Sequence, residues 1–75
     1  MIFIDLTADR CPLALVKFKL ALKHLAVGEE LQVALKDAGA RQDVPRYLNK
    51  INCSYTELKN DPQVLLLSIV KHLTP

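Results

Sequence analysis

The order in which short apolar segments and longer helix-like segments follow one another constrains this chain most. Four segments rich in apolar and β-branched residues predict strands. They span residues 2–6, 31–35, 53–58 and 64–70. The first two gaps between them are long enough for a helix, whereas the last gap holds the turn-forming residues 60–62, Asn-Asp-Pro. We therefore expect strand and helix to alternate twice and a hairpin to close the fold.

Both long gaps carry apolar residues at helical spacing. Residues 13–26 contain no glycine or proline, and Gly28 follows as a helix terminator. Their apolar face comprises Ala14, Leu15, Phe18, Ala21, Leu22 and Leu25. In the second gap Asp37 is a good N-cap, and Pro45 predicts a kink or the end of a loose first turn. The apolar stripe of this second helix comprises Ala40, Val44, Leu48 and Ile51.

This order of elements predicts the α/β class. We expect a two-layer βαβαββ sandwich, in which a four-stranded mixed sheet carries two helices on one face. The 75 residues provide material for a single domain, spanning residues 1–75. Residues 64–70 are apolar on both sides of their strand. The open face of the sheet is therefore either partly covered by a partner or simply hydrophobic.

The composition excludes several classes of protein. Hydrophobic residues at 51% and charged residues at 24% suit a packed domain and exclude a disordered chain. No apolar run approaches the roughly 18 residues of a membrane span, and the N-terminus lacks the basic region of a secretory signal. A net charge of +2 is too small to predict direct nucleic-acid binding. Two cysteines without a signal sequence predict free thiols in the cytoplasm.

The segment that could support chemistry is Arg10-Cys11-Pro12. Proline suits the first helical position, so Cys11 would be the N-cap, close to unpaired N–H groups and the positive end of the helix dipole. We expect these groups and Arg10 to lower the pKa of the Cys11 thiol, with Asp9 opposing them in part. The alternative is a small buried hydrophobe without a chemical role. Since Ser, Asp and Asn are better N-caps than Cys, the chemical role is favoured.

Three segments together resemble a known family. Residues 5–12, Asp-Leu-Thr-Ala-Asp-Arg-Cys-Pro, with a helix after them, resemble the Cys-Pro signature of the TusA/SirA/YedF sulfur-carrier family. Residues 27–31 resemble the Gly-Glu segment that leads into its second strand, and residues 37–45 resemble its second helix, including the proline. The resemblance covers essentially the whole chain.

The resemblance implies a sulfur carrier of βαβαββ fold, in which Cys11 receives sulfane sulfur as a persulfide. A cysteine desulfurase or another sulfurtransferase would be the donor, and an acceptor sulfur-relay protein would take the sulfur onward, on one route to tRNA thiolation. It implies that Asp5 and Arg10 orient the loop and favour the anionic sulfur beside Pro12. No cofactor, metal or membrane is implied, and no acid–base group is expected near Cys11.

The sequence departs from the family pattern at three positions. Ala14 replaces a second proline of the signature, Ala8 replaces a glycine before it, and Ala38 replaces a proline that often opens the second helix. Cys11 is retained, while the identity of the donor and of the acceptor is not predicted. Two alternatives therefore stand beside the sulfur carrier: a non-catalytic interaction or regulatory module on the same fold, and a thiol redox sensor.

A second candidate surface lies on the outer side of the first helix. Leu13, Val16 and Leu20 fall opposite the core stripe, among Lys17, Lys19 and Lys23. They are either scattered surface residues or an apolar docking patch with a basic rim beside Cys11.

The other chemistry-bearing residues are expected to be structural. Cys53 should lie at the far end of the sheet from Cys11 and belong to the core. His24 and His72 are isolated and are expected on the surface, so no metal site is predicted.

Overall fold

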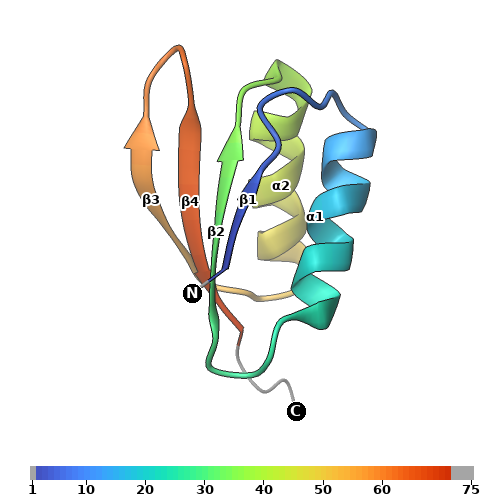
Figure 1. The fold of residues 1–75 in the computed structure, drawn as a ribbon, viewed down its shortest axis with the longest axis vertical. Helices are drawn as coiled ribbons and strands as arrows, with labels where there is room; N and C mark the ends of the chain where they lie inside the picture. The colour runs from blue at the N-terminus through green and yellow to red at the C-terminus, as the bar shows by residue number, and fades with distance from the viewer. Residues whose placement is uncertain (1, 72–75) are drawn as a thin grey trace.

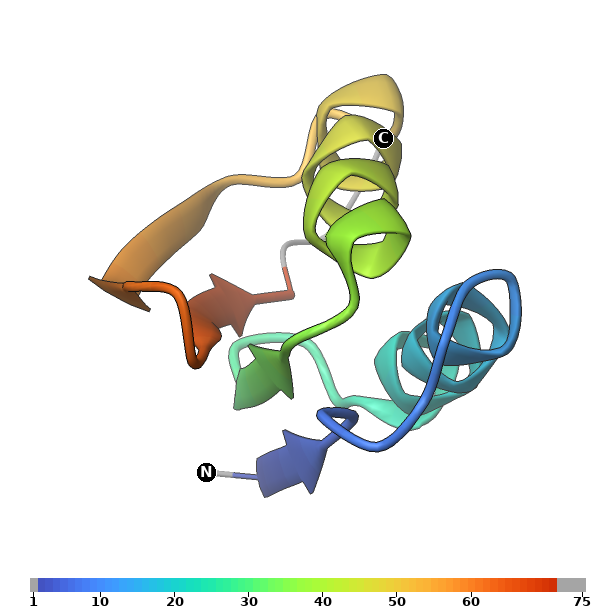
Figure 2. The same cartoon turned by 90° about the horizontal axis from the view of Figure 1, so that it is seen from above.

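The computed structural model describes residues 2–71, and it confirms the predicted order of elements. The strands are β1 (Ile2–Asp5), β2 (Glu30–Leu35), β3 (Tyr55–Asn60) and β4 (Leu65–Val70), and the helices are α1 (Leu13–His24) and α2 (Ala38–Lys50). Both helices cover the same face of a four-stranded sheet, as Figure 1 and Figure 2 show. The predicted α/β two-layer architecture is therefore confirmed. His72 lies outside the described residues.

The strand order of the sheet is β1-β2-β4-β3. β1 and β2 are parallel, whereas β4 is antiparallel to both β2 and β3, so the sheet is mixed as expected. Because β1 and β2 point the same way, the loops that follow them end at the same edge of the sheet. The N-termini of α1 and α2 therefore lie next to each other, at the upper end of Figure 1.

The core lies between the sheet and the helices, and the predicted helix stripes supply most of one side of it. Alternate residues of the two central strands point toward the helices, as the two-residue period of a strand requires. The buried residues are Leu31, Val33 and Leu35 of β2, Leu65, Leu67 and Ile69 of β4, Ala14, Phe18 and Leu22 of α1, and Ala40, Val44 and Leu48 of α2. Leu6 and Leu25, at the ends of the connecting loops, complete this cluster.

The start of α2 agrees with the prediction, whereas the boundary after it differs. Asp37 is the N-cap as predicted, and Pro45 lies inside α2 rather than at the end of a loose first turn. The predicted start of the third strand at Cys53 is wrong, because the Cys53 N–H donates to the carbonyl of Leu48 at 2.8 Å and belongs to the C-terminal turn of α2. Asn52 before it takes a left-handed conformation with φ of 56°. β3 begins only at Tyr55.

The open face of the sheet is mixed in character. Phe3 and Val70 are exposed on it, and Leu66 is half-buried. Between β2 and β4, however, the carboxylate of Glu30 accepts hydrogen bonds from the hydroxyl of Ser68 and the side-chain amide of Gln32. The apolar character predicted for both sides of β4 is thus interrupted by a polar cluster.

Candidate functional site

The loop between β1 and α1 carries Cys11, and a hydrogen-bonded turn fixes the start of this loop. Oδ1 of Asp5 accepts hydrogen bonds from the backbone N–H of Thr7 at 2.9 Å and from its hydroxyl at 2.6 Å. These bonds hold the pKa of the Asp5 carboxyl below its ordinary value, the hydroxyl contributing most. Asp5 thus orders the first turn of the loop, although its side chain does not reach the thiol.

One carboxylate connects the Cys11 loop to α2. Oδ2 of Asp37 accepts a hydrogen bond from the backbone N–H of Cys11 at 3.2 Å and another from the N–H of Ala40 at 3.1 Å. The bond from Cys11 is the main cause of the lowered pKa of Asp37, followed by the bond from Ala40, and the charge of Arg10 adds to them. Asp37 therefore caps α2 and holds the backbone of Cys11 against the first turn of that helix.

Gly39 has no side chain, and Cys11 packs against this position of α2. A Cβ atom at this position would lie 3.4 Å from the Cβ of Cys11 and 3.1 Å from Oδ2 of Asp37. The distance to Oδ2 of Asp37 is tighter than ordinary van der Waals contact, so a side chain here would displace that oxygen by a few tenths of an ångström, while the distance to Cys11 lies at the short limit of ordinary contact. The absence of a side chain at residue 39 permits the close approach of the two segments.

The predicted position of Cys11 at the N-cap of α1 is wrong by one residue. Pro12 is the N-cap, and the helix begins at Leu13. The peptide bond between Cys11 and Pro12 is cis. Cys11 is half-buried and lies in the turn before α1, where it contacts the first turn of α2 as well. The thiol therefore lies between the N-termini of two helices instead of at the end of one.

The predicted direction of the Cys11 pKa is also wrong. The pKa of the thiol is raised, mainly by burial, and further by hydrogen bonding to the carboxylate of Asp43 and by the negative charge of that group. The charge of Asp37 acts in the same direction, whereas the N–H of Leu15 favours the thiolate. One N–H of the first helical turn thus does act on the sulfur, but burial and two carboxylates outweigh it. In the resting protein the thiol is neutral.

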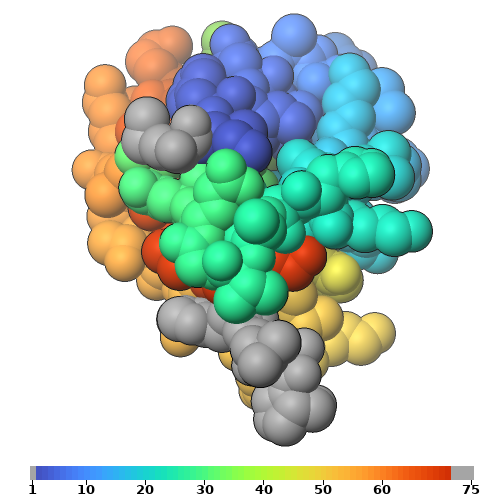
Figure 3. Space-filling view, turned by 60° about the horizontal axis from the view of Figure 1, so that its bottom comes forward, coloured from blue at the N-terminus to red at the C-terminus, as the bar shows by residue number. Residues whose placement is uncertain are grey.

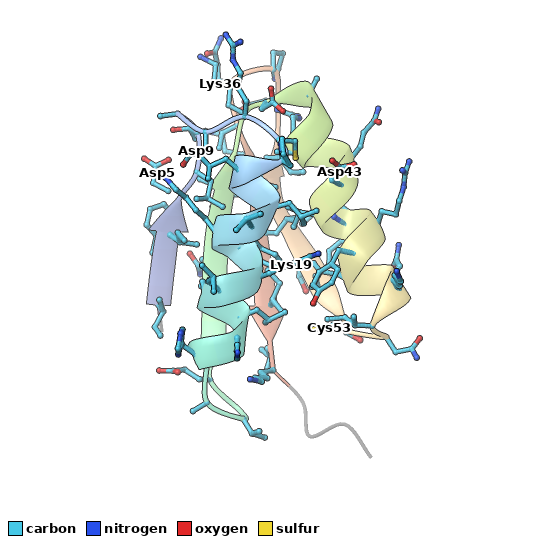
Figure 4. The ribbon with its side chains drawn as sticks, turned by 90° about the vertical axis from the view of Figure 1, so that its right-hand side faces the viewer. Asp5, Asp9, Lys19, Lys36, Asp43 and Cys53 are labelled. Carbon is cyan, nitrogen blue, oxygen red and sulfur yellow. The ribbon has the colours of Figure 1, made fainter. Side chains whose placement is uncertain are left out.

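Asp43 is the site residue that the sequence analysis missed. It follows Gly39 by four residues in α2, so the two residues share one helix face, the face that meets Cys11. Figure 4 shows Asp43 near the upper end of α2, at the same end of the molecule as Asp5 and Asp9. The signal that could have found it is the parallel pairing of β1 and β2, which brings the starts of both helices together.

The supporting residues Arg10 and Pro12 are both exposed beside Cys11. Arg10 influences Asp37 by its charge, so its predicted effect on the sulfur is indirect. Asp9 binds Lys17 at 2.8 Å. This ion pair holds Lys17 against the loop that precedes α1.

The candidate docking residues lie on the outer side of α1, as predicted. Leu13, Val16 and Leu20 have exposed fractions of 52%, 49% and 53%, values that are high for large apolar side chains. The row begins two residues after Cys11 and runs down the helix with spacings of three and four residues. These three residues form one continuous surface row.

The second cysteine does not belong to this site. Both cysteines are free thiols. Figure 4 shows Cys53 at the end of α2 opposite to Asp43, in agreement with the predicted placement far from Cys11. Cys53 is half-buried against the core, and burial raises its pKa. Within residues 2–71 no group of three or more His, Cys, Asp or Glu side chains is arranged to hold a metal ion. Nor does this part of the chain contain a helix of the length and apolarity that crossing a bilayer requires.

Comparison with known proteins identifies the family that this fold and this cysteine define. The family of sulfurtransferase TusA matches residues 2–71, so the chain belongs to the TusA family. A "putative sulfur carrier protein" of Archaeoglobus fulgidus is 28% identical over 61 residues, which cover 81% of this chain and 84% of that protein.

A solved structure supports the fold independently. The crystal structure of a SirA-like protein from Desulfitobacterium hafniense matches with a TM-score of 0.79. The match covers 97% of this chain and all of that one, at 24% sequence identity. At this identity the likeness concerns the fold alone, and it agrees with the two-layer arrangement of Figure 1. Membership of the TusA family supports a role as a sulfur carrier with partners in sulfur relay.

Proposed function

We propose that this protein accepts a sulfane sulfur as a persulfide on Cys11 and passes it to an acceptor protein. The observation that carries the proposal is the placement of Cys11, whose backbone is held by Asp37 while its half-buried thiol faces Asp43. A thiol used only for packing would need neither a tethered backbone nor a facing carboxylate. Family membership supplies the chemical class of the cargo.

The first step of the proposed reaction is the transfer of one sulfur atom from a donor persulfide. The Cys11 sulfur attacks the terminal sulfur of the donor, an S–S bond forms between them, and the S–S bond of the donor breaks. The donor leaves as a thiolate. No net oxidation or reduction occurs, because one S–S bond replaces another.

Asp43 provides a destination for the proton of the Cys11 thiol. Since the raised pKa keeps this thiol neutral, the proton must leave as the new S–S bond forms. The carboxylate of Asp43 can accept it and return it to the departing donor thiolate. In the second step a nucleophile of the acceptor attacks the terminal sulfur of the Cys11 persulfide, and Cys11 leaves as a thiolate and regains its proton.

The proposal also includes the donor, the acceptor and the cellular compartment. The donor is a cysteine desulfurase or another sulfurtransferase, and the acceptor is a sulfur-relay protein, on a route that can end in tRNA thiolation. The row of Leu13, Val16 and Leu20, with Lys17, is the contact surface beside the nucleophile. A reducing cytoplasm would keep both thiols free.

Intact mass spectrometry tests the proposal directly. The protein is incubated with a cysteine desulfurase and cysteine, and separately with a low-molecular-weight persulfide. We expect a gain of one sulfur atom that is lost in Cys11→Ser and retained in Cys53→Ser. A wild-type protein that gains no sulfur from either source would contradict the carrier function and favour an interaction module. A sulfenic acid on Cys11, or a disulfide between two molecules through Cys11, under mild oxidation would instead indicate a redox sensor.

A further inference from the structure

A groove at the other end of the helices has a different character from the Cys11 site. It has a volume of about 530 Å³ and lies between α1, α2 and the end of β4. Its apolar walls include Val16, Leu20 and Tyr47, and Lys19, Lys23 and Lys71 surround it. In Figure 3 the red end of β4 lies between the teal end of α1 and the yellow end of α2.

Contacts of its own lysines place positive charge at the groove. The ammonium of Lys71 donates hydrogen bonds to the carbonyls of Leu22 at 3.1 Å and Lys23 at 3.3 Å, which places a positive charge at the C-terminal end of α1. The ammonium of Lys19 lies 4.7 Å from the centre of the Tyr47 ring. Among residues 2–71, no carboxylate forms an ion pair with any of the three groove lysines.

We infer that this groove is a docking site for an acidic amphipathic helix of a partner protein. The apolar residues Val16 and Leu20 are four residues apart along α1, and Tyr47 faces them from α2. Two helices side by side present a groove into which the apolar ridge of a third helix packs. The surrounding ammonium groups then select acidic residues on both flanks of that ridge.

The chemistry of the walls argues against an extended peptide as the occupant. Both long walls are helices, whose backbone groups are already paired within the helix. An extended segment would enter this apolar groove without partners for its own N–H and C=O groups, at the cost of its hydrogen bonds to water. A helix satisfies its backbone internally and therefore loses nothing of this kind.

The charge of the chain argues against a second copy as the occupant. α1 contains no acidic residue, and α2 contains only Asp43. Neither helix could thus present an apolar face with acidic flanks to the groove of another molecule. Two such grooves facing each other would bring like charges together.

The groove also connects to the proposed site of sulfur transfer. Val16 borders the groove and belongs to the exposed row that starts at Leu13, one helical turn or about 5 Å further toward Cys11. A helix anchored in the groove would hold the rest of its protein over Cys11. The placement of the partner over Cys11 rests on the proposed function, whereas the docking of a helix in the groove does not.

The docking is tested with a designed helical peptide of about 15 residues, the length at which isolated helices become stable. The peptide carries leucines at positions i, i+4 and i+7 with glutamates on both flanks, and it is titrated into the ¹⁵N-labelled full chain. We expect amide shift changes at the groove residues of α1 and α2. Lys23→Glu should weaken binding about tenfold, and Leu20→Ser should weaken it as well.

The matched control is Lys50→Glu, because Lys23 and Lys50 both lie in the last turn of a helix and both variants change the charge equally. This control should bind within about twofold of the wild type. Equal weakening by Lys23→Glu and Lys50→Glu would overturn the inference, as would shift changes on the open face of the sheet. Vesicles of phosphatidylglycerol that bind the protein through the groove in preference to the peptide would assign the groove to a membrane and overturn it too.

Two loading experiments separate this inference from the sulfur-carrier function. If the groove recruits a donor protein, Lys23→Glu should raise the KM for loading by a cysteine desulfurase and leave loading by a low-molecular-weight persulfide unchanged. Loading that is equal in Lys23→Glu and the wild type with both donors would contradict the role of the groove and leave the carrier function intact. Failure of both donors with the wild type would contradict the carrier function alone.

Discussion

Oδ2 of Asp37 lies 3.2 Å from the backbone nitrogen of Cys11 and 3.1 Å from that of Ala40, so a single oxygen atom joins the β1–α1 loop to the first turn of α2. The N-cap of one helix thereby also positions Cys11, which precedes the other helix. The local order of the site depends on a carboxylate that is 26 residues away in the chain.

Asp37→Ala should therefore lower both the stability and the order of the site. The two backbone N–H groups lose their acceptor, so the midpoint of thermal unfolding should fall, and alkylation of Cys11 should speed up as the loop loosens. Asp37→Asn keeps an oxygen acceptor and should retain most of the stability.

Asp61→Ala is a matched control for this effect. The carboxylate of Asp61 accepts hydrogen bonds from the N–H groups of Gln63 and Val64 in the β3–β4 turn. This variant should also lower the unfolding midpoint but leave the alkylation rate of Cys11 unchanged. A changed rate in Asp61→Ala would mean that global stability, not the tether, controls access to Cys11.

Asp43→Asn should change the alkylation rate and the sulfur-loading rate of Cys11 in opposite directions, although these two rates usually change together. Removing the carboxylate that raises the pKa of the thiol should move the pH midpoint of iodoacetamide alkylation to lower pH, so that alkylation at pH 7 becomes faster. Sulfur loading by a desulfurase should become slower, because the proton acceptor is gone.

The comparison is best made in a Cys53→Ser background, with Asp9→Asn as the control. Asp9 lies in the same loop as Cys11 but binds Lys17, and it is not among the groups that shift the Cys11 pKa. If Asp43→Asn slows alkylation and loading alike, Asp43 is a structural residue and not a proton acceptor.

Gly39→Ala should lower the loading rate of Cys11 while changing the free energy of unfolding little. Alanine is a better helix former than glycine by about 1 kcal/mol, which should offset much of the cost of the contacts of the new methyl group with Cys11 and Asp37. We expect the free energy of unfolding to stay within about 1 kcal/mol of the wild type and the rate of Cys11 loading to fall. Gln42→Ala, at an exposed position of the same helix, should leave the loading rate unchanged.

Leu67→Ala tests the packing of the two layers. Leu67 is fully buried in β4, and truncation of a buried leucine costs about 2–5 kcal/mol. In a domain of this size that loss is a large part of the total stability, so the urea concentration at the unfolding midpoint should fall strongly. Leu66→Ala, one residue earlier and half-buried on the open face, should cost less. Equal losses at the two positions would show that the open face is covered as well.

The two thiols should make the protein less stable at alkaline pH. Cys11 and Cys53 both have folded-state pKa values above the ordinary value of 9.0. As the pH rises through this value, the unfolded chain loses its thiol protons first, so the folded state binds more protons and stability falls. The double variant Cys11→Ser/Cys53→Ser should show a smaller loss between pH 7 and about pH 10. An identical loss in both proteins would mean that other groups cause it.

The sequence predicted the fold because periodicity carries most of the information that this fold needs. The helical stripe of Phe18 in α1 and that of Val44 in α2 have the period of a helix. The short apolar runs of β2 and β4 have the length and composition of strands. The start of the third strand was wrong because Cys53 looks like a strand residue, while a backbone hydrogen bond to Leu48 assigns it to the end of a helix. Such bonds depend on tertiary geometry and have no local pattern.

The sequence could single out Cys11 as the candidate nucleophile, but it could not predict the charges around the thiol. The Cys-Pro segment identified Cys11, since only the identity and spacing of neighbours were needed. Asp43 and Gly39 act on Cys11 through the packing of α2 against the β1–α1 loop, at a distance of about 30 residues in the chain. The expected pKa shift considered the helix that follows Cys11 and the neighbours Arg10 and Asp9, but neither burial nor the carboxylates of α2, and it therefore had the wrong sign.

The irregularity in β3 affects how this protein behaves in crowded solution. The pairing of β3 with β4 shifts register between Glu57 and Lys59, so the free edge of the sheet on that side is bulged and carries a lysine. The opposite edge, β1, is only four residues long. A bulged, charged edge and a very short one are both poor templates for strands of other molecules. Both sheet edges are thus protected against pairing between molecules, in a protein whose α1 exposes an apolar row.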